Sequence, residues 1–299
     1  MTMQEAAATR SRSRLATPPH RWRILMKSFA RTMAMPKRLA ALLAAITMAA
    51  GAMPPSLDLS GQARLDAYRQ APASAGALVY RGTVFPQDRA GAAPLFIYER
   101  RVALMAEGQV AAAHITHTLD GEVIIAEVAQ YAAGYALQRF DATNKQLGHS
   151  GSVVLSNGGR HLEFRLLDNG KLSTASEDVD VPVVSGPSVH GFILHHWDLL
   201  ARGETMPVRM IVLAQKQTYA FNIRRVEGSA GKAGSTSFSI TPSSWLVRLA
   251  LKPLSVTFDN TTRNVIRYEG RVPPMRQLEG GLKTLDARVD YTMAMAAYR

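Results

Sequence analysis

Phe96-Ile97-Tyr98-Glu99-Arg100-Arg101-Val102 is the stretch that decides the fold. Successive side chains of a β-strand point to opposite sides, so a strand here places Phe96, Tyr98 and Val102 on one face. The charged Glu99 and Arg101 then lie on the other face. An apolar face backed by a polar one is typical of an antiparallel sheet that covers a core on one side.

The same alternation recurs along the chain, in the segments 162–166, 219–224 and 289–293. Turn sequences separate such segments, at Asp120-Gly121, Asn157-Gly158 and Asn169-Gly170. Asn, Asp and Gly tolerate the positive φ that tight hairpins require. The pattern predicts about fourteen strands between residues 77 and 293, paired as successive hairpins.

Two helices are expected to interrupt these strands. In the first, over 188–202, an apolar stripe runs through Val189, Phe192, Ile193, Trp197 and Leu200. Ser185 or Ser188 is its expected start, and Gly203 its end. The second opens at Thr241-Pro242, carries Trp245, Leu246 and Leu249 on one side, and ends before Pro253.

An amphipathic helix needs an apolar surface to cover, and the sheet offers one. We therefore expect a mainly β fold: a single curved antiparallel sheet of meander topology, a half-barrel or a barrel, with two short helices packed on it. The helix at 188–202 is expected on the concave side of the sheet.

The N-terminal segment differs from the rest of the chain. Residues 1–52 hold nine Lys or Arg and one acid, Glu5. Lys37 and Arg38 precede an apolar run of about ten residues, which is short for a bilayer core that needs about 20. Small residues, Ala50-Gly51-Ala52, follow it. This order predicts a cleavable signal peptide.

The predicted mature chain begins at Met53, with an arm or short helix and loop over 53–76 and the β-rich domain over 77–299. No Arg-Arg pair precedes the apolar run, which favours the general secretory route and a periplasmic location. No transmembrane segment is expected in the mature chain.

Composition excludes several functions. The chain has no cysteine, so disulfides, catalytic thiols and thiolate metal sites are absent. Its formal net charge is +12, but residues 53–299 hold only 26 basic against 22 acidic side chains. That balance does not indicate nucleic-acid binding. No glycine-rich phosphate loop follows a strand, and no cofactor is predicted.

Residues capable of catalysis or metal binding do not form known motifs. His190, His195, His196 and Asp198 are close in sequence, but His195 and His196 point about 100° apart on a helix, so no metal site is predicted. No Gly-x-Ser-x-Gly elbow is present. The acidic run Glu177, Asp178 and Asp180 is expected to be a solvated loop.

Candidate ligand contacts come from the apolar face of the sheet and from the helices. They are the wall residues Tyr98, Phe164, Phe192, Trp197, Phe221 and Trp245, with Arg225 as the polar contact. The alternative is that the aromatic residues are ordinary core. Arg100-Arg101 and Arg224-Arg225 each place one Arg toward the apolar side, where a partner is required. Either such an Arg binds the head group of an amphiphile, or it pairs with Glu99, Glu127 or Glu227.

Three segments carry a resemblance to other proteins: 192–204, which ends in Leu199-Leu200-Ala201-Arg202-Gly203-Glu204, 219–226, and the stretch from Trp245 to Tyr268-Glu269-Gly270. Together they resemble uncharacterised secreted proteins of Gram-negative bacteria, similar to the domain-of-unknown-function family numbered 3108. The resemblance covers about residues 78 to 295. It implies a fold and an exported location and assigns no catalytic residue.

Three functions follow as hypotheses. A large apolar face beside a covering helix favours binding or carriage of an apolar or amphiphilic envelope molecule. A cell-envelope scaffold or assembly factor acting through a protein partner is the alternative. A polysaccharide or ester hydrolase is the third, for which only the scattered acids Asp141, Asp168 and Glu163 are available. The sequence favours a protein that is not an enzyme.

Overall fold

The computed structural model describes residues 78–104, 109–132, 134–226 and 234–296. The predicted signal peptide and the predicted arm at 53–76 lie outside these residues. Within them the chain is mainly β, as predicted. Its strands are β1 (Leu78–Pro86), β2 (Phe96–Leu104), β3 (Val110–His117), β4 (Val123–Tyr131), β5 (Leu137–Asn144), β6 (His149–Ser156), β7 (His161–Asp168), β8 (Lys171–Asp178), β9 (Val183–Val184), β10 (Met206–Val212), β11 (Gln217–Arg225), β12 (Ser235–Pro242), β13 (Leu254–Asp259), β14 (Val265–Leu278) and β15 (Gly281–Ala296).

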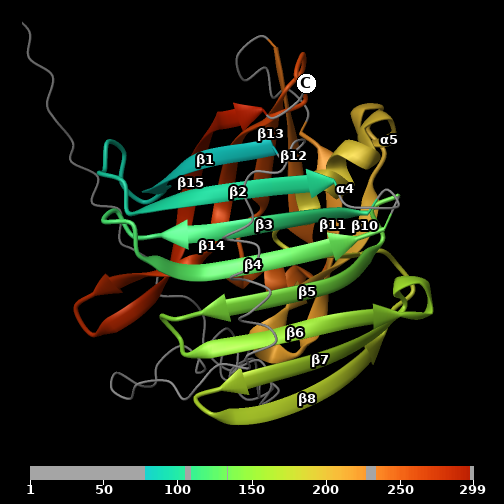
Figure 1. Cartoon of the computed structure of the whole chain (residues 1–299). Helices are drawn as coiled ribbons and strands as arrows, with labels where there is room; N and C mark the ends of the chain where they lie inside the picture. Colours follow the sequence, from blue (N-terminus) through green and yellow to red (C-terminus); the bar gives the residue numbers. More distant parts are fainter. Residues whose placement is uncertain (1–77, 105–108, 133, 227–233, 297–299) are drawn as a thin grey trace, which may run out of the picture. The chain divides into compact units, whose positions relative to one another are not determined.

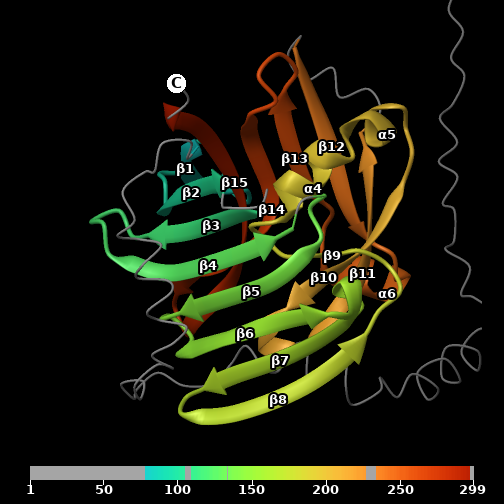
Figure 2. The same ribbon diagram turned by 45° about the vertical axis from the view of Figure 1, so that its right-hand side comes forward.

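All fifteen strands belong to one sheet, in the order β8-β7-β6-β5-β4-β3-β2-β1-β15-β14-β13-β12-β11-β10-β9. Every pairing is antiparallel except that of β9 with β10. The sheet bends back over itself, so that β2–β8 form one wall and β10–β14 form the facing wall (Figures 1 and 2). We call β1–β8 the first half of the sheet and β9–β15 the second half. The large apolar core lies between them.

The sheet does not close into a barrel, because β8 and β9 at its two ends are not paired with each other. Side chains bridge this seam instead. Glu177 on β8 accepts hydrogen bonds from the backbone N of Thr218 at 2.7 Å and from its Oγ1 at 2.8 Å, both on β11. It also forms an ion pair with Arg209 on β10. The prediction of a loop is wrong at Glu177 and Asp178, which end β8, although Asp178 is exposed as expected.

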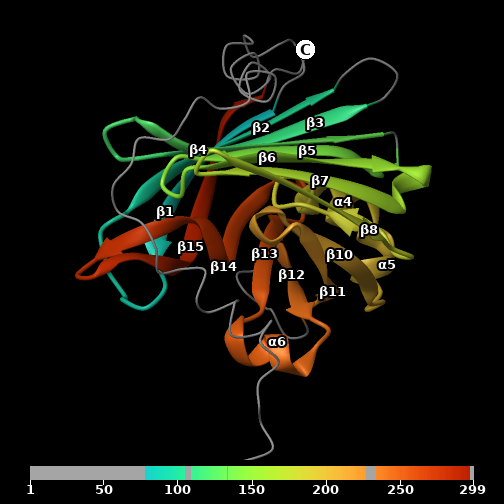
Figure 3. The ribbon, with the colours of Figure 1, turned by 90° about the horizontal axis from the view of Figure 1, so that it is seen from below.

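The helices are short: α4 (Val189–His195), α5 (Trp197–Ala201) and α6 (Trp245–Ala250). In Figure 3, α4 lies between the two walls of the sheet. Val189 through Ile193 are all buried, so α4 occupies the concave side as predicted. A Cβ at Gly191 would lie 2.4 Å from the ring of Tyr135, in the connection between β4 and β5, and 2.9 Å from the hydroxyl of Tyr131 on β4, so glycine allows α4 to lie close to both.

Two predicted helix boundaries were wrong. The helix expected over 188–202 divides at His196, whose φ and ψ of −98° and 19° are not helical. Thr241 and Pro242 belong to β12, and α6 begins at Trp245. The predicted end at Gly203 is confirmed: its φ of +93° lets the next residue, Glu204, bond back to Leu199 O. No helix of the described residues is long and apolar enough to cross a membrane.

Candidate functional site

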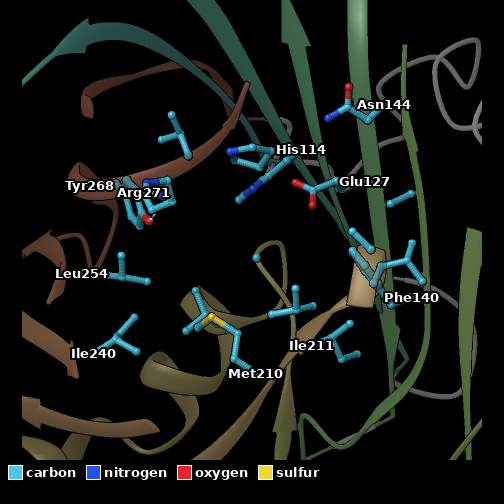
Figure 4. A pocket seen from close by; sticks show the side chains of 18 of the residues that line it. His114, Glu127, Phe140, Asn144, Met210, Ile211, Ile240, Leu254, Tyr268 and Arg271 are labelled. Atoms are coloured by element: carbon cyan, nitrogen blue, oxygen red, sulfur yellow. Dashed lines mark hydrogen bonds between the residues drawn. The ribbon is translucent and has the colours of Figure 1, made fainter. Parts of the chain in front are cut away.

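A cavity of about 400 Å³ lies between the two halves of the sheet. Its apolar wall includes Phe140 of β5, Met210 and Ile211 of β10, Ile240 of β12 and Leu254 of β13 (Figure 4). Residues from β2 to β7 therefore face residues from β10 to β15 across it. Ligand pockets commonly have volumes of about 300–1,000 Å³ and mostly apolar walls with few polar groups. This cavity has both properties.

The polar part of the wall begins with a row of three side chains across adjacent strands. Arg100 on β2 lies opposite His114 on β3, and His114 lies opposite Glu127 on β4. Directly opposed residues share one face of a sheet, so all three point to the inside. The row continues to Ala142 on β5 and Gly151 on β6. Ala142, directly beside Glu127 in this row, also lines the cavity.

Arg100 is a buried cation with two neutral partners. Its side chain is 3% exposed. Its Nη1 donates to Pro187 O at 2.8 Å and bonds His114 Nε2 at 2.7 Å. A guanidinium only donates, so His114 Nε2 is the acceptor and a neutral His114 carries its proton on Nδ1. Arg100 thus connects β2 to the turn before α4.

The two histidines at the site are held in the neutral form. Burial, and then the charge of Arg100, lower the pKa of His114 well below its usual value. Burial, Arg100 and His114 do the same to the pKa of His190 on α4. His190 is 2% exposed, and its Nδ1 has no hydrogen-bond partner among the described residues. Its ring lies 5.6 Å from that of His114.

Glu127 is the acid of this site. Its carboxylate lies beside His114 and points into the cavity (Figure 4). Within the part of the chain that the structure describes, no group donates a hydrogen bond to it and no cation pairs with it. Burial raises the pKa of its carboxyl group to about 7. At neutral pH the protonated and the ionised forms of this carboxyl group are therefore both populated.

Three phenols also line the cavity, Tyr98 of β2, Tyr268 of β14 and Tyr291 of β15, together with the polar side chains of Asn144, His149 and Ser150. Burial is the largest cause that raises the pKa of each phenol, so all three phenols are neutral at physiological pH. The Tyr268 hydroxyl donates to Arg271 O at 2.6 Å. Arg271 also lines the cavity, and its Nε donates to Asp286 at 2.6 Å.

The structure brings two of the residues proposed from the sequence as ligand contacts, Tyr98 and Phe221, to this cavity. Phe192 lines a second cavity of about 360 Å³, and Phe164 is buried in the neighbouring core cluster. Trp197 packs in the core, with Arg263 over its ring at 3.8 Å. These three do not line the cavity that holds Glu127.

Arg225 and Trp245, the other two proposed contacts, lie away from the cavity. Arg225 is exposed, and its Nη1 donates to Ala201 O at 3.0 Å. Trp245 is 59% exposed and Leu249 is 78% exposed, so α6 presents apolar side chains to solvent. Of the adjacent arginines Arg100-Arg101 and Arg224-Arg225, Arg100 is the buried one, because it occupies an inward-facing position of β2.

The residues considered for metal binding and hydrolysis do not gather at this site. Among the described residues, no group of three or more His, Asp and Glu is arranged to hold a metal ion. Asp141 is buried and forms two hydrogen bonds of 2.7 Å with Arg139. Asp168 pairs with His149 at 3.0 Å, and Glu163 is exposed. None of these three acids lines the cavity.

No family model and no curated protein matches this sequence. Among solved structures, the chain is similar to a beta-barrel-like protein of the domain of unknown function DUF1849 from Brucella abortus. That match has 10% identity and a TM-score of 0.40, and covers 73% of this chain and 97% of the other. A porin-like protein from Bacteroides uniformis matches at 8% identity and a TM-score of 0.21, over 74% and 98%. The resemblance to the family numbered 3108 stays a prediction.

Sequence reasoning missed Glu127 as a site residue. The available signal was an acid in the middle of a strand whose neighbours of the same parity, Ile125, Ala129 and Tyr131, are apolar. His114 and His117 lie three residues apart on β3, so strand alternation points them to opposite faces, and this spacing does not identify a site. Neither observation predicts that α4 brings His190 next to His114.

Proposed function

We propose that this protein binds an apolar or amphiphilic molecule in the cavity between the two halves of its sheet. The observation that carries the proposal is the cavity of about 400 Å³, with apolar side chains from both halves and a polar group at Glu127. An apolar ligand tail gains about 0.8 kcal/mol for each CH₂ group removed from water. The row of Arg100, His114 and Glu127 favours the polar head group of an amphiphile at this end of the cavity, and the apolar wall favours its tail.

The proposed setting is the periplasm, because the basic, apolar and small-residue segments of 1–52 have the order of an export signal. A carrier of envelope lipids or of other amphiphiles acts in that compartment. The chemistry of the site supports binding more than catalysis. Glu127 is the one acid among the described wall residues, and its cross-strand neighbours are His114 and Ala142, not a serine.

Native mass spectrometry of the purified protein, before and after organic extraction, tests the proposal. A bound molecule gives a reproducible additional mass that extraction removes. The extracted protein is then titrated with a fluorescent amphiphile. Absence of both a bound mass and any uptake would falsify the proposal.

A cavity-filling substitution locates the binding. Ala142 lines the cavity directly opposite Glu127 in the sheet, so Ala142→Leu fills the space beside the carboxylate. Binding is expected to weaken at least about tenfold, which corresponds to about 1.4 kcal/mol. The matched control is Ala220→Leu, an exposed alanine on β11. Equal binding by the two variants would place the ligand outside this cavity.

A further inference from the structure

We propose that the cavity selects amphiphiles that carry a basic amine, which pairs with Glu127. This inference rests on the proposed function and specifies the head group of its ligand. The charged and titratable side chains of the wall decide which head group the cavity favours.

Arg271 on β14 is the cation among the described wall residues, and it already pairs with Asp286 of β15. The ring of His149 on β6 contacts Asp168 of β7 at 3.0 Å. Arg100 is not part of the wall, and its Nη1 is held between His114 and Pro187. An anionic head group therefore meets no free cation among the described wall residues, and it meets the carboxylate of Glu127.

The acid of the wall differs from these basic groups because it is unpaired among the described residues. Glu127 has no partner in the described part of the chain, and its carboxylate faces the cavity. A carboxylate accepts hydrogen bonds and donates none when ionised, so the missing partner is a donor. An ammonium supplies several N–H donors together with the opposite charge. A hydroxyl supplies one donor and no charge, and it is the weaker partner.

The groups that face Glu127 do not supply a competing positive charge at close range. His114 of β3 and His190 of α4 are neutral, and so are the phenols of Tyr98 and Tyr268. Arg100 lies two strands from Glu127, a backbone separation of about 10 Å. Since the charge interaction weakens with distance, an ammonium in contact with Glu127 gains more than it loses to Arg100.

His190 provides a second contact for the same head group. Its buried Nδ1 has no partner among the described residues, and the ring lines the cavity from α4. A neutral imidazole nitrogen without its proton accepts a hydrogen bond. In the tautomer that leaves Nδ1 unprotonated, His190 adds a second acceptor, on a different element from Glu127, for an amine that has more than one N–H group.

The experiment compares three probes of equal chain length: dodecylamine, dodecanol and dodecanoate, each below its micelle concentration. Calorimetry or displacement of a fluorescent amphiphile gives their affinities for the purified protein. Dodecylamine is expected to bind at least about tenfold more tightly than either of the other two. Its affinity is expected to rise about tenfold from pH 6 to pH 8, as Glu127 loses its proton.

Glu127→Gln keeps the shape of the side chain and removes its charge. This variant is expected to lose at least about tenfold in dodecylamine affinity and to lose the pH dependence. Its affinity for dodecanol is expected to change less than threefold, which also shows that the cavity is intact. Glu163→Gln, at a side chain 71% exposed on β7, is the matched control and leaves all three affinities unchanged.

The two proposals fail in different ways. Binding of dodecanol or dodecanoate as tightly as dodecylamine overturns the selection of amines and leaves the cavity as a binding site. An equal loss of affinity for all three probes in Glu127→Gln overturns the selection of amines as well. If none of the probes binds to the unmodified protein, the proposed function fails together with this inference.

Discussion

Two glutamates on inward-facing strand positions have opposite surroundings. Glu177 on β8 accepts two hydrogen bonds from Thr218 and pairs with Arg209 at the seam of the sheet. Glu127 on β4 has no such partner among the described residues, and burial raises its pKa to about 7. The protein supplies donors and a cation to the first carboxylate, which connects two elements. The second is the carboxylate to which we assign the amine of the proposed ligand.

The largest expected effect is a pH-dependent stabilisation by Glu127→Gln. The carboxyl has a folded pKa of about 7 against about 4.3 in the unfolded chain. Since the folded value is the higher one, its contribution to stability is complete below pH 4.3 and is lost as the pH rises through 7. At pH 8 the variant is expected to be more stable by up to about 4 kcal/mol.

Chemical denaturation at pH 4, 6 and 8 measures this difference. The gain in unfolding free energy of Glu127→Gln over the unmodified protein should be close to zero at pH 4 and reach its full size by pH 8. A gain that does not depend on pH would mean that Glu127 has a partner in solution, and the contrast between the two glutamates would disappear.

The next effect is the destabilisation caused by Glu177→Ala. This change leaves Arg209 without its carboxylate and the N–H of Thr218 without an acceptor. Removing one member of a fully buried pair costs about 3–5 kcal/mol, and the partial exposure of this pair reduces the expected loss to about 2 kcal/mol. Denaturation with urea measures the loss.

Hydrogen exchange locates the effect of Glu177→Ala. Faster exchange is expected at the seam, at the amides of β8 and at Thr218. The matched control is Glu163→Ala on the neighbouring strand β7, which should change stability by no more than about 0.5 kcal/mol. Similar losses of stability in Glu177→Ala and Glu163→Ala would show that Glu177 does not stabilise the seam.

The smallest effect is expected for Trp245→Ala. Trp245 is a proposed ligand contact from the sequence, but it is 59% exposed on α6 and does not line the cavity. Stability should change by about 0.5 kcal/mol or less, and the affinity for amphiphiles should not change. A binding loss as large as that of Ala142→Leu would mean that ligands also contact α6, and the site would have to be extended beyond the cavity.

Local patterns predicted most of the strands and turns. The turn prediction at Asn169-Gly170 is confirmed, because both residues have positive φ, of 46° and 84°. The two-residue strand β9 was missed, because Val183-Val184 is too short to show an alternation. The missed division at His196 has a similar cause: the apolar stripe of the sequence continues across it, from Phe192 to Trp197.

The site was predicted less well than the fold. Tyr98 and Phe221 were identified because they lie on the apolar face of amphipathic strands, and that face covers the cavity. The same pattern also selects ordinary core residues such as Phe164. Arg225 was chosen in preference to Arg100 without knowledge of the register, which places Arg100 opposite His114.

The sequence by itself determined the alternation of the strands, several of their turns and the apolar stripe that becomes α4 and α5, because these depend on residues close together in the chain. Only the tertiary structure decided that Arg100, His114 and Glu127 form one row, that α4 adds His190 to it, and that Glu177 bridges the seam. The reason is physical. Strand register and the exclusion of water join residues far apart in the sequence, and these two factors give Glu127 and Glu177 their different partners.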